Sequence, residues 1–183
     1  MSEDSTTRPV ADQHLVDIDL YAKLDAMGIA HRTVEHEPAY TVDQAQHLRG
    51  ELDGAHIKNL FLRDKKKNIW LVTVLEERDV DLKQLRGVLG AKGNLSFGSP
   101  DLLMECLGVI PGSVTPLGIV NDRDGRVTVV LDKGVLDQPL ANVHPLRNDR
   151  TTQIASQDLL KLLEAENHPP LILDFAELPD PAV

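Results

Sequence analysis

The chain of 183 residues contains one cysteine, Cys106, and no apolar run long enough to cross a membrane. A single cysteine excludes an internal disulfide and fits a reducing compartment. Cys106 lies in an apparent helix, 101–107, where a small core residue is expected rather than a nucleophile. The N-terminus lacks the apolar segment of a secretory signal, so we expect a cytoplasmic protein.

Positive charge is also scarce. The 19 Lys and Arg residues are outnumbered by 29 Asp and Glu residues, which gives a formal net charge of −10. This balance argues against a protein that grips nucleic acid by broad neutralisation of phosphates. The exception is the run of Arg63 with the lysines at 65–67, to which Arg147 and Arg150 are available from a later loop. A nucleic-acid partner is therefore expected to bind weakly, at this local basic patch.

The motifs of several common chemistries are missing. The seven histidines are scattered, and the chain has neither a His-Glu-x-x-His motif nor a cysteine pair, so a metal site is not supported. Gly-x-Ser-x-Gly, the phosphate-binding Gly-rich loop and the dinucleotide fingerprint are absent too. We therefore expect no metal, no cofactor and no ordinary serine-hydrolase or nucleotide-binding machinery.

Periodicity and turn residues predict a mixture of helices and strands. Three predicted helices are 17–27, 41–48 and 81–89. A fourth starts at Ser99–Pro100 and stops at Gly108, and a fifth is capped by Ser156 and runs through Glu166. The predicted strands are 31–35, 57–63, 69–75, 117–120, 127–131, a short one with Val143 and His144, and 171–173. Because these elements follow no regular β-α-β rhythm, we expect a single α+β domain on a mixed sheet, 14–175, between flexible tails 1–13 and 176–183.

A buried strand at 56–64, which ends in the basic turn 65–68, is the centre of the predicted domain. With a side-chain period of two, Lys58 shares one face with the leucines at 60 and 62, while Asn59 points to the other face. A lysine on such an apolar face either extends its ammonium out at the strand end or points it into a cavity. In the second case a ligand supplies the counter-charge.

Several segments resemble the YbaK-like aminoacyl-tRNA deacylases. They are the strand pair 56–62 and 69–72, the stretch 95–100, the Gly-x-x-x-Pro loop 112–116, and the stretch 142–146 with Asn148 after it. The similarity spans roughly residues 15 to 175 and is closest to the free-standing bacterial branch that removes alanine from proline tRNA. It implies a mixed sheet or barrel-like core flanked by helices, and an aminoacyl-tRNA deacylase that spares proline attached to the same tRNA.

The resemblance also implies partners and site residues. The implied partner is mischarged tRNA, bound at its acceptor end, and the acidic overall charge favours a prolyl-tRNA synthetase that delivers it. The basic turn supplies the expected tRNA contacts, Lys65, Lys66 and Lys67. The other expected site residues are catalytic Lys58 and the substrate-binding positions Tyr40, Thr41, Asn59, Gly98, Ser99, Gly112, Ser113, Val114 and His144.

Hydrolysis of an aminoacyl ester needs charge stabilised on the carbonyl oxygen and an oriented water, but no strong nucleophile. The ammonium of Lys58 can hold the terminal phosphate or ribose, or it can polarise the carbonyl itself. Free amides in the loop 112–114 are candidate donors to the oxyanion, since a missing side chain at Gly112 lets backbone approach a ligand.

Each of these residues also has a structural interpretation. The loop 112–114 can be an ordinary tight turn after Pro111, Asn59 can make a structural hydrogen bond, and Ser99 can be a helix cap. His144 can be a satisfied loop histidine, and the lysine turn can be a solvated turn. Both interpretations stay open at this stage.

The predicted function follows the logic of a double sieve. A synthetase built for proline cannot exclude the smaller alanine strongly, so a second, smaller pocket destroys what passes. Cysteine is of similar size, and a related branch clears cysteine from the same tRNA, which makes a Cys-tRNA(Pro) deacylase the first alternative. A non-catalytic module that binds a synthetase or tRNA is the second alternative, and it would not need Lys58.

Overall fold

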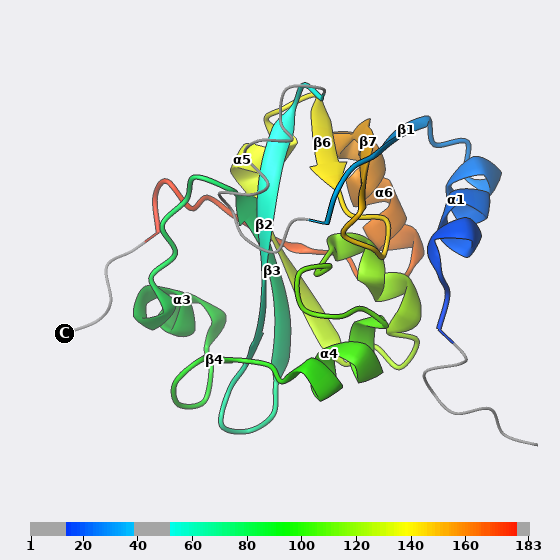
Figure 1. The fold of residues 1–183 in the computed structure, drawn as a ribbon. Coiled ribbons are helices and arrows are strands. Elements are labelled where there is room, and N and C mark those ends of the chain that lie inside the picture. Colours follow the sequence, from blue (N-terminus) through cyan, green and yellow to red (C-terminus); the bar gives the residue numbers. More distant parts are fainter. Residues whose placement is uncertain (1–13, 39–51, 179–183) are drawn as a thin grey trace, which may run out of the picture.

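The structure is a computed structural model that describes residues 14–38 and 52–178 (Figure 1). The predicted helix 41–48, with Tyr40 and Thr41, lies outside this range. In chain order the elements are α1 (Asp17–Ala26), β1 (His31–Glu35), β2 (Ala55–Arg63), β3 (Ile69–Leu75), α3 (Leu82–Leu89), β4 (Ser96–Phe97), α4 (Pro100–Leu107), the 3₁₀ helix η3 (Pro116–Asn121), β5 (Val127–Asp132), α5 (Lys133–Leu136), β6 (Leu140–Val143), β7 (Arg150–Ala155), α6 (Ser156–Ala165) and β8 (Leu171–Leu173).

The predicted single α+β domain on a mixed sheet is confirmed. One eight-stranded sheet has the order β1-β7-β6-β2-β3-β5-β8, and β4 pairs with β2 (Figure 1). On one edge, β2 pairs with β3 along the predicted hairpin. On its other edge it pairs with β6 at residues 55–56 and with β4 at residues 62–63. Between these two short pairings, residues 57–61 pair with no described strand on that edge.

The alternation of side chains in β2 and β3 divides the core into two layers. The larger layer contains Phe61 and Leu71 and is covered by α1, α4, η3 and α6, and Cys106 is buried within it, as predicted. The smaller layer contains Leu62 and Trp70 and is covered by α3, which lies on the opposite side of the sheet (Figure 1). Lys58 and Asn59 therefore project to opposite faces, as the period of two predicted.

Most helix ends follow the predicted capping residues. The Asp81 carboxylate caps α3, Ser99 Oγ caps α4 with Pro100 in its first turn, and Gly108 ends α4 in a left-handed conformation (φ 67°). None of the described helices is long and apolar enough to span a membrane.

Two predictions of local structure were wrong. The apolar run 117–120 is not a strand but belongs to η3, whose six residues are all buried. Thr115 caps this helix, accepting a hydrogen bond from Leu117 N at 3.2 Å, and Pro116 occupies its first position. Ser156 is not a cap but the first residue of α6, because β7, which was not predicted, runs directly into the helix and leaves Ala155 at the N-cap.

Candidate functional site

Lys58 lies near the middle of β2 and is half-buried. Its ammonium donates a hydrogen bond to the backbone carbonyl of Arg78, just beyond the end of β3. This segment is well anchored, because the Arg78 guanidinium pairs with the buried carboxylate of Asp132 (Nε to Oδ2, 3.0 Å). An ammonium has three N–H donors, so this contact leaves two for a ligand.

Asn59, the next residue, fastens a distant loop to β2. Its Nδ2 donates to the carbonyl of Val114 (3.1 Å), and its Oδ1 accepts from the hydroxyl of Thr73 (2.6 Å), its cross-strand partner on β3. The structural hydrogen bond that the sequence left open is therefore present. It holds the Gly-x-x-x-Pro loop against β2 one residue away from Lys58.

The structure contains the tight turn after Pro111 that the sequence left open, and this turn determines which amides of the loop remain open. Ser113 N donates to the carbonyl of Ile110 (3.0 Å), and Gly112 has φ 89°. Pro111 and Gly112 thus occupy the two central positions of a type II turn, whose second central residue needs a positive φ. The Ser113 amide is used within the turn, whereas the amides of Gly112 and Val114 donate to no acceptor among the described residues.

His144 follows the last residue of β6. The parallel pairing of β6 with β2 ends at His56–Asn142, two residues before His144. Burial lowers the pKa of His144, a hydrogen bond to the carbonyl of Arg150 (Nδ1 to O, 3.1 Å) opposes this, and His36 lowers it further. At neutral pH His144 is therefore a neutral imidazole whose Nδ1–H donates to that carbonyl, which leaves Nε2 as an acceptor.

A cavity of about 350 Å³ adjoins the turn, and it includes only Ser113 of the predicted residues. Its other lining residues are Pro38, Met104, Gly108, Val109, Ile110, Leu146, Arg147, Asn148 and Asp149. Asn148 is 7% exposed, and its Nδ2 has no hydrogen-bond acceptor within the described residues. In the sequence Asn148 stands out only through the family resemblance, because no spacing rule shows that its amide is buried beside a cavity.

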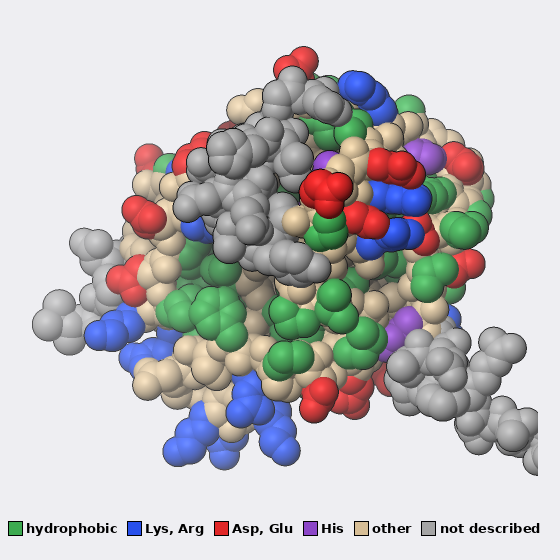
Figure 2. All heavy atoms as spheres, in the orientation of Figure 1, with side chains coloured by type: hydrophobic (Ala, Val, Ile, Leu, Met, Phe, Trp, Pro, Cys, Tyr) green, Lys and Arg blue, Asp and Glu red, His purple; other side chains and the backbone are tan. Residues whose placement is uncertain are grey.

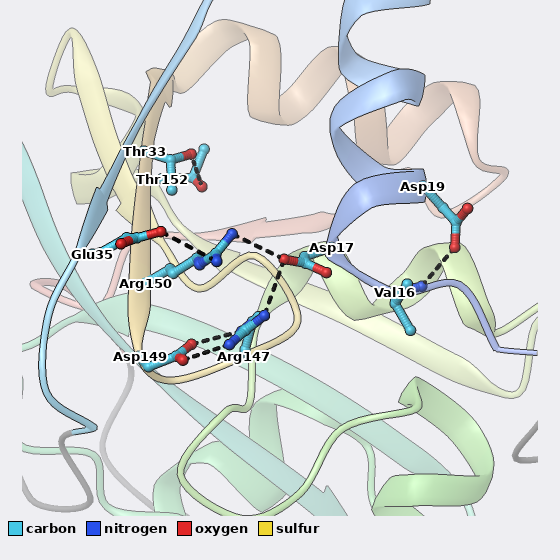
Figure 3. Close-up of polar contacts among 9 residues, drawn as sticks. All are labelled: Val16, Asp17, Asp19, Thr33, Glu35, Arg147, Asp149, Arg150 and Thr152. Atoms are coloured by element: carbon cyan, nitrogen blue, oxygen red, sulfur yellow. Dashed lines mark hydrogen bonds and ion pairs between the residues drawn. The ribbon is translucent and has the colours of Figure 1, made fainter.

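The arginines at 147 and 150 are not available for phosphate, which corrects the expectation drawn from the sequence. Arg147 binds both carboxylate oxygens of Asp149 (2.7 and 2.5 Å), and both arginines contact Oδ2 of Asp17 in α1 (3.4 and 3.2 Å; Figure 3). The hydrogen bonds from Arg147 lower the pKa of Asp149 despite an opposing effect of burial. This network ties the cavity wall to α1, and the sequence could not reveal it because Asp17 is 130 residues away from Arg147.

The basic turn is larger than the sequence indicated. Asp64 is 2% exposed, and its carboxylate accepts the amides of Lys66 (2.9 Å), Asn68 (2.9 Å) and Lys92 (2.8 Å), as well as Nδ2 of Asn68 (2.9 Å). It therefore brings the backbone of Lys92 beside the predicted tRNA contacts. Figure 2 shows a cluster of Lys and Arg side chains at the lower edge of the molecule. We call this cluster the basic corner, and its exposed members are Arg63, Lys65, Lys66, Lys67 and Lys92.

Gly98 and Ser99 have clear structural roles at the same end of β2. Gly98 N donates to the carbonyl of Phe61 (2.9 Å), and a Cβ at Gly98 would lie 2.5 Å from the Phe61 ring. Ser99 Oγ accepts from Leu102 N (3.1 Å) at the start of α4. The structure thus gathers Lys58, Asn59 and the loop 112–114 around the middle of β2, and it places Gly98, Ser99 and the basic corner at the end of this strand. In residues 14–38 and 52–178, no group of three or more His, Cys, Asp or Glu side chains is arranged to hold a metal ion.

Comparison with known proteins gives a consistent picture. A model of the aminoacyl-tRNA editing domain matches residues 36–162. The prolyl-tRNA synthetase associated domain-containing protein 1 of Mus musculus is 40% identical over 161 residues, which cover 86% of this chain and 95% of the mouse protein. The prolyl-tRNA editing protein ProX of Acetoanaerobium sticklandii is 36% identical over 148 residues, which cover 80% of this chain and 90% of that protein. The crystal structure of a hypothetical protein, 17% identical, shares the fold with a TM-score of 0.66 over 86% of this chain and 97% of its own.

Proposed function

Because this chain belongs to the aminoacyl-tRNA editing domain family, we propose that it hydrolyses the ester of mischarged tRNA, with alanine on proline tRNA as its substrate. The name of a relative, a prolyl-tRNA editing protein, supports proline tRNA as the carrier. The uncharged carbonyl of an aminoacyl ester suits a site with one ammonium and open backbone amides, since its hydrolysis needs stabilisation of developing negative charge more than a nucleophilic side chain.

The observation that carries the proposal is the hydrogen bond from Asn59 to the Val114 carbonyl. It holds the loop 112–114, which has two open amides, beside the stretch of β2 that carries Lys58 and lacks a described strand partner on one edge. An ester carbonyl at this open edge of β2 would have the amides of Gly112 and Val114 as candidate donors from the Asn59 face and the ammonium of Lys58 as a candidate donor from the opposite face.

In the proposed reaction, water attacks the ester carbon while these donors stabilise the negative charge that develops on the carbonyl oxygen. The bond from this carbon to the ribose oxygen then breaks. The ribose oxygen of the tRNA takes up one proton of the water and becomes a hydroxyl, and the amino acid leaves as a carboxylate after its remaining acid proton passes to solvent. His144 Nε2 is a candidate acceptor for a proton of the attacking water. A neutral histidine suits this role at neutral pH.

Selectivity against proline follows from size. A synthetase pocket shaped for proline discriminates weakly against a smaller side chain, whereas a second pocket that is too small for proline spares the correct product. Serine and cysteine resemble alanine in size, so the sieve alone does not select alanine among them.

The deciding experiment measures release of alanine, cysteine and proline from matched charged proline tRNAs, with wild type and Lys58→Ala. We expect fast, lysine-dependent release of alanine and retention of proline. Lys161→Ala, at an exposed position of α6, is the matched control and should behave as wild type. Release of cysteine alone would change the substrate, and equal rates on all three tRNAs would contradict the sieve.

A second function, association with prolyl-tRNA synthetase, is favoured by the name of the mouse relative. The net charge of −10 also means that most of the surface repels tRNA, so delivery by a synthetase would help capture. Sedimentation of the protein with purified prolyl-tRNA synthetase, with and without tRNA, tests this association. Co-sedimentation without any release of amino acid by wild type would favour a binding module over an enzyme.

A further inference from the structure

Phe97 is an exposed aromatic side chain on a short, well-held strand. It is 63% exposed, yet its backbone pairs with Leu62 of β2, and the next residue, Gly98, donates to the carbonyl of Phe61 (2.9 Å). The ring thus stands on a backbone that is fixed on both sides of its Cα. Preorganisation of this kind favours contact with a flat ligand, because little ordering is lost on binding.

The pairing register also gives the direction of this ring. Residues directly opposite each other in an antiparallel pair project to the same face, so Phe97 shares the face of Leu62. Leu95, two residues earlier on the same segment, is buried in the smaller core layer together with Leu62, which agrees with this direction. Lys58 projects to this face as well, four residues before Leu62. Along the strand, Phe97 lies about 13 Å from Lys58, at 3.3 Å per residue.

The basic corner begins directly beyond Phe97. Arg63, which pairs with Ser96, is its first member, and Gly93 packs against Lys65, where a Cβ would lie 3.1 Å from Lys65 Cβ. None of its five cations forms an ion pair with a described residue, in a chain whose formal net charge is −10. Figure 2 shows the Lys and Arg side chains below an exposed hydrophobic area. Unpaired cations beside an exposed ring are the two features of a site for single-stranded nucleic acid.

We propose that Phe97 is a stacking platform for an unpaired base near the 3′ end of the tRNA, and that the basic corner holds the phosphates of the strand leading to it. This inference rests on the proposed function, because it takes the ester to lie at Lys58. The distance from Phe97 to Lys58 corresponds to about four stacked nucleotides at 3.4 Å each. Single-stranded RNA is favoured over an acidic protein segment because every base offers a flat face to the ring.

The test uses an uncharged RNA hairpin that ends in the unpaired nucleotides of the tRNA acceptor, with 2-aminopurine placed at each unpaired position in turn. Stacking on Phe97 quenches the fluorescence of 2-aminopurine at one position. We expect Phe97→Ala to abolish this quenching and to weaken binding roughly 5- to 150-fold, the range for loss of one base–aromatic stack. Phe97→Trp should retain both, and Ile172→Ala, at an exposed position of β8, is the matched control.

Lys92→Ala separates the two parts of the site. This substitution should weaken binding of the RNA hairpin and reduce the magnitude of the slope of log K against log salt concentration by about 1. The quenching at saturation should stay as in wild type. In deacylation assays, Phe97→Ala should raise KM and leave kcat nearly unchanged. Thermal unfolding of each variant shows that the protein remains folded.

The outcomes distinguish this proposal from the proposed function. Quenching that depends on Phe97, in a wild type that releases no amino acid, would support the platform and refute the hydrolase. If wild type releases amino acid and Phe97→Ala shows the same quenching, the same RNA affinity and the same KM as wild type, the platform is refuted and the proposed hydrolase stands. An effect of Phe97→Ala on synthetase binding alone would also refute it.

Discussion

The two faces of β2 carry different kinds of polar contact. On the Lys58 face, the ammonium of Lys58 donates to one neutral acceptor among the described residues, the Arg78 carbonyl, and has two further N–H donors. On the Asn59 face, the amide of Asn59 is engaged on both sides, by Val114 and Thr73. Adjacent residues in one strand thus differ in degree: Lys58 uses one of its three N–H donors, whereas Asn59 uses both its amide nitrogen and its amide oxygen in contacts with the protein.

This difference gives a way to separate residues that contact a substrate from residues that position a loop. A side chain whose donors and acceptor are satisfied by the protein contributes mainly to stability, since its loss leaves buried partners unpaired. A side chain with spare donors contributes little to stability and is available to a ligand. The predictions below test this division, beginning with the largest expected effect.

Replacing Lys58 by Ala should give the largest loss of activity and only a small loss of stability. In the proposed reaction the ammonium stabilises developing charge, and loss of one such donor typically lowers kcat by about 10²- to 10³-fold. Single-turnover deacylation of alanine-charged proline tRNA measures this loss, with Lys83→Ala on the exposed surface of α3 as the control. A variant that unfolds, or one that keeps full turnover, would contradict the division between the faces.

Gly98→Ala tests the packing on the Asn59 face. The new Cβ would lie 2.5 Å from the ring of Phe61, which is 4% exposed and cannot yield, so we expect a loss of about 1–3 kcal/mol in the free energy of unfolding. Urea denaturation measures it. The control, Gly87→Ala in α3, has no neighbour within 4 Å of its Cβ and should instead gain about 0.5–1 kcal/mol. Equal effects of the two substitutions would show that the contact with Phe61 is not rigid.

Asn59→Ala should lose stability and activity together. The buried hydroxyl of Thr73 and the carbonyl of Val114 would lose their partner, at a cost of about 1–3 kcal/mol in unfolding free energy. Turnover should fall less than in Lys58→Ala, because the loop 112–114 is loosened while the ammonium remains. Denaturation and deacylation of the same samples give both values, with the exposed Asn94→Ala as the control. A loss of turnover greater than that of Lys58→Ala would reverse the roles of the two residues.

Local signals account for the parts of the fold that the sequence predicted well. Asp81, Ser99 and Gly108 mark helix ends through contacts within a few residues, and the hairpin of β2 and β3 follows from two apolar runs around a polar turn. The run 117–120 failed because a short, fully buried apolar segment has no periodicity that separates a strand from a helix. The start signal of Thr115 followed by Pro116 would have favoured the helix.

Most of the contacts in the candidate site could not be predicted, because they join distant segments. Asn59 and Val114 are 55 residues apart, and Lys92 reaches the basic corner through a carboxylate 28 residues away. Periodicity placed Lys58 and Asn59 on opposite faces, but it could not show which of them the protein already satisfies. That distinction depends on tertiary hydrogen bonds.

The smallest predicted effect is a pH dependence at Asp64, which follows the last residue of β2. Burial is the largest single influence on its pKa and raises it, but the hydrogen bonds from Asn68, Lys92 and Lys66 together lower it to about 2. A carboxyl group with a depressed pKa stabilises the fold above its unfolded pKa of about 3.9, and this contribution is lost as the pH falls towards 2. Asp64→Asn should therefore be less stable than wild type at pH 6, with a difference that shrinks between pH 4 and pH 2.

Denaturation midpoints at pH 6, 4, 3 and 2 measure this difference, and Gly87→Ala, which changes no ionisable group, provides the reference. The Asp64 carboxylate accepts the backbone amide of Lys92, so removing this carboxylate should also free Lys92 from its position in the basic corner. A difference that does not shrink towards pH 2 would mean that these hydrogen bonds do not favour the ionised carboxylate. Asp64 would then stabilise the turn equally well in its protonated form. The hydrogen bond between Asp64 and Lys92 would persist when Asp64 is protonated.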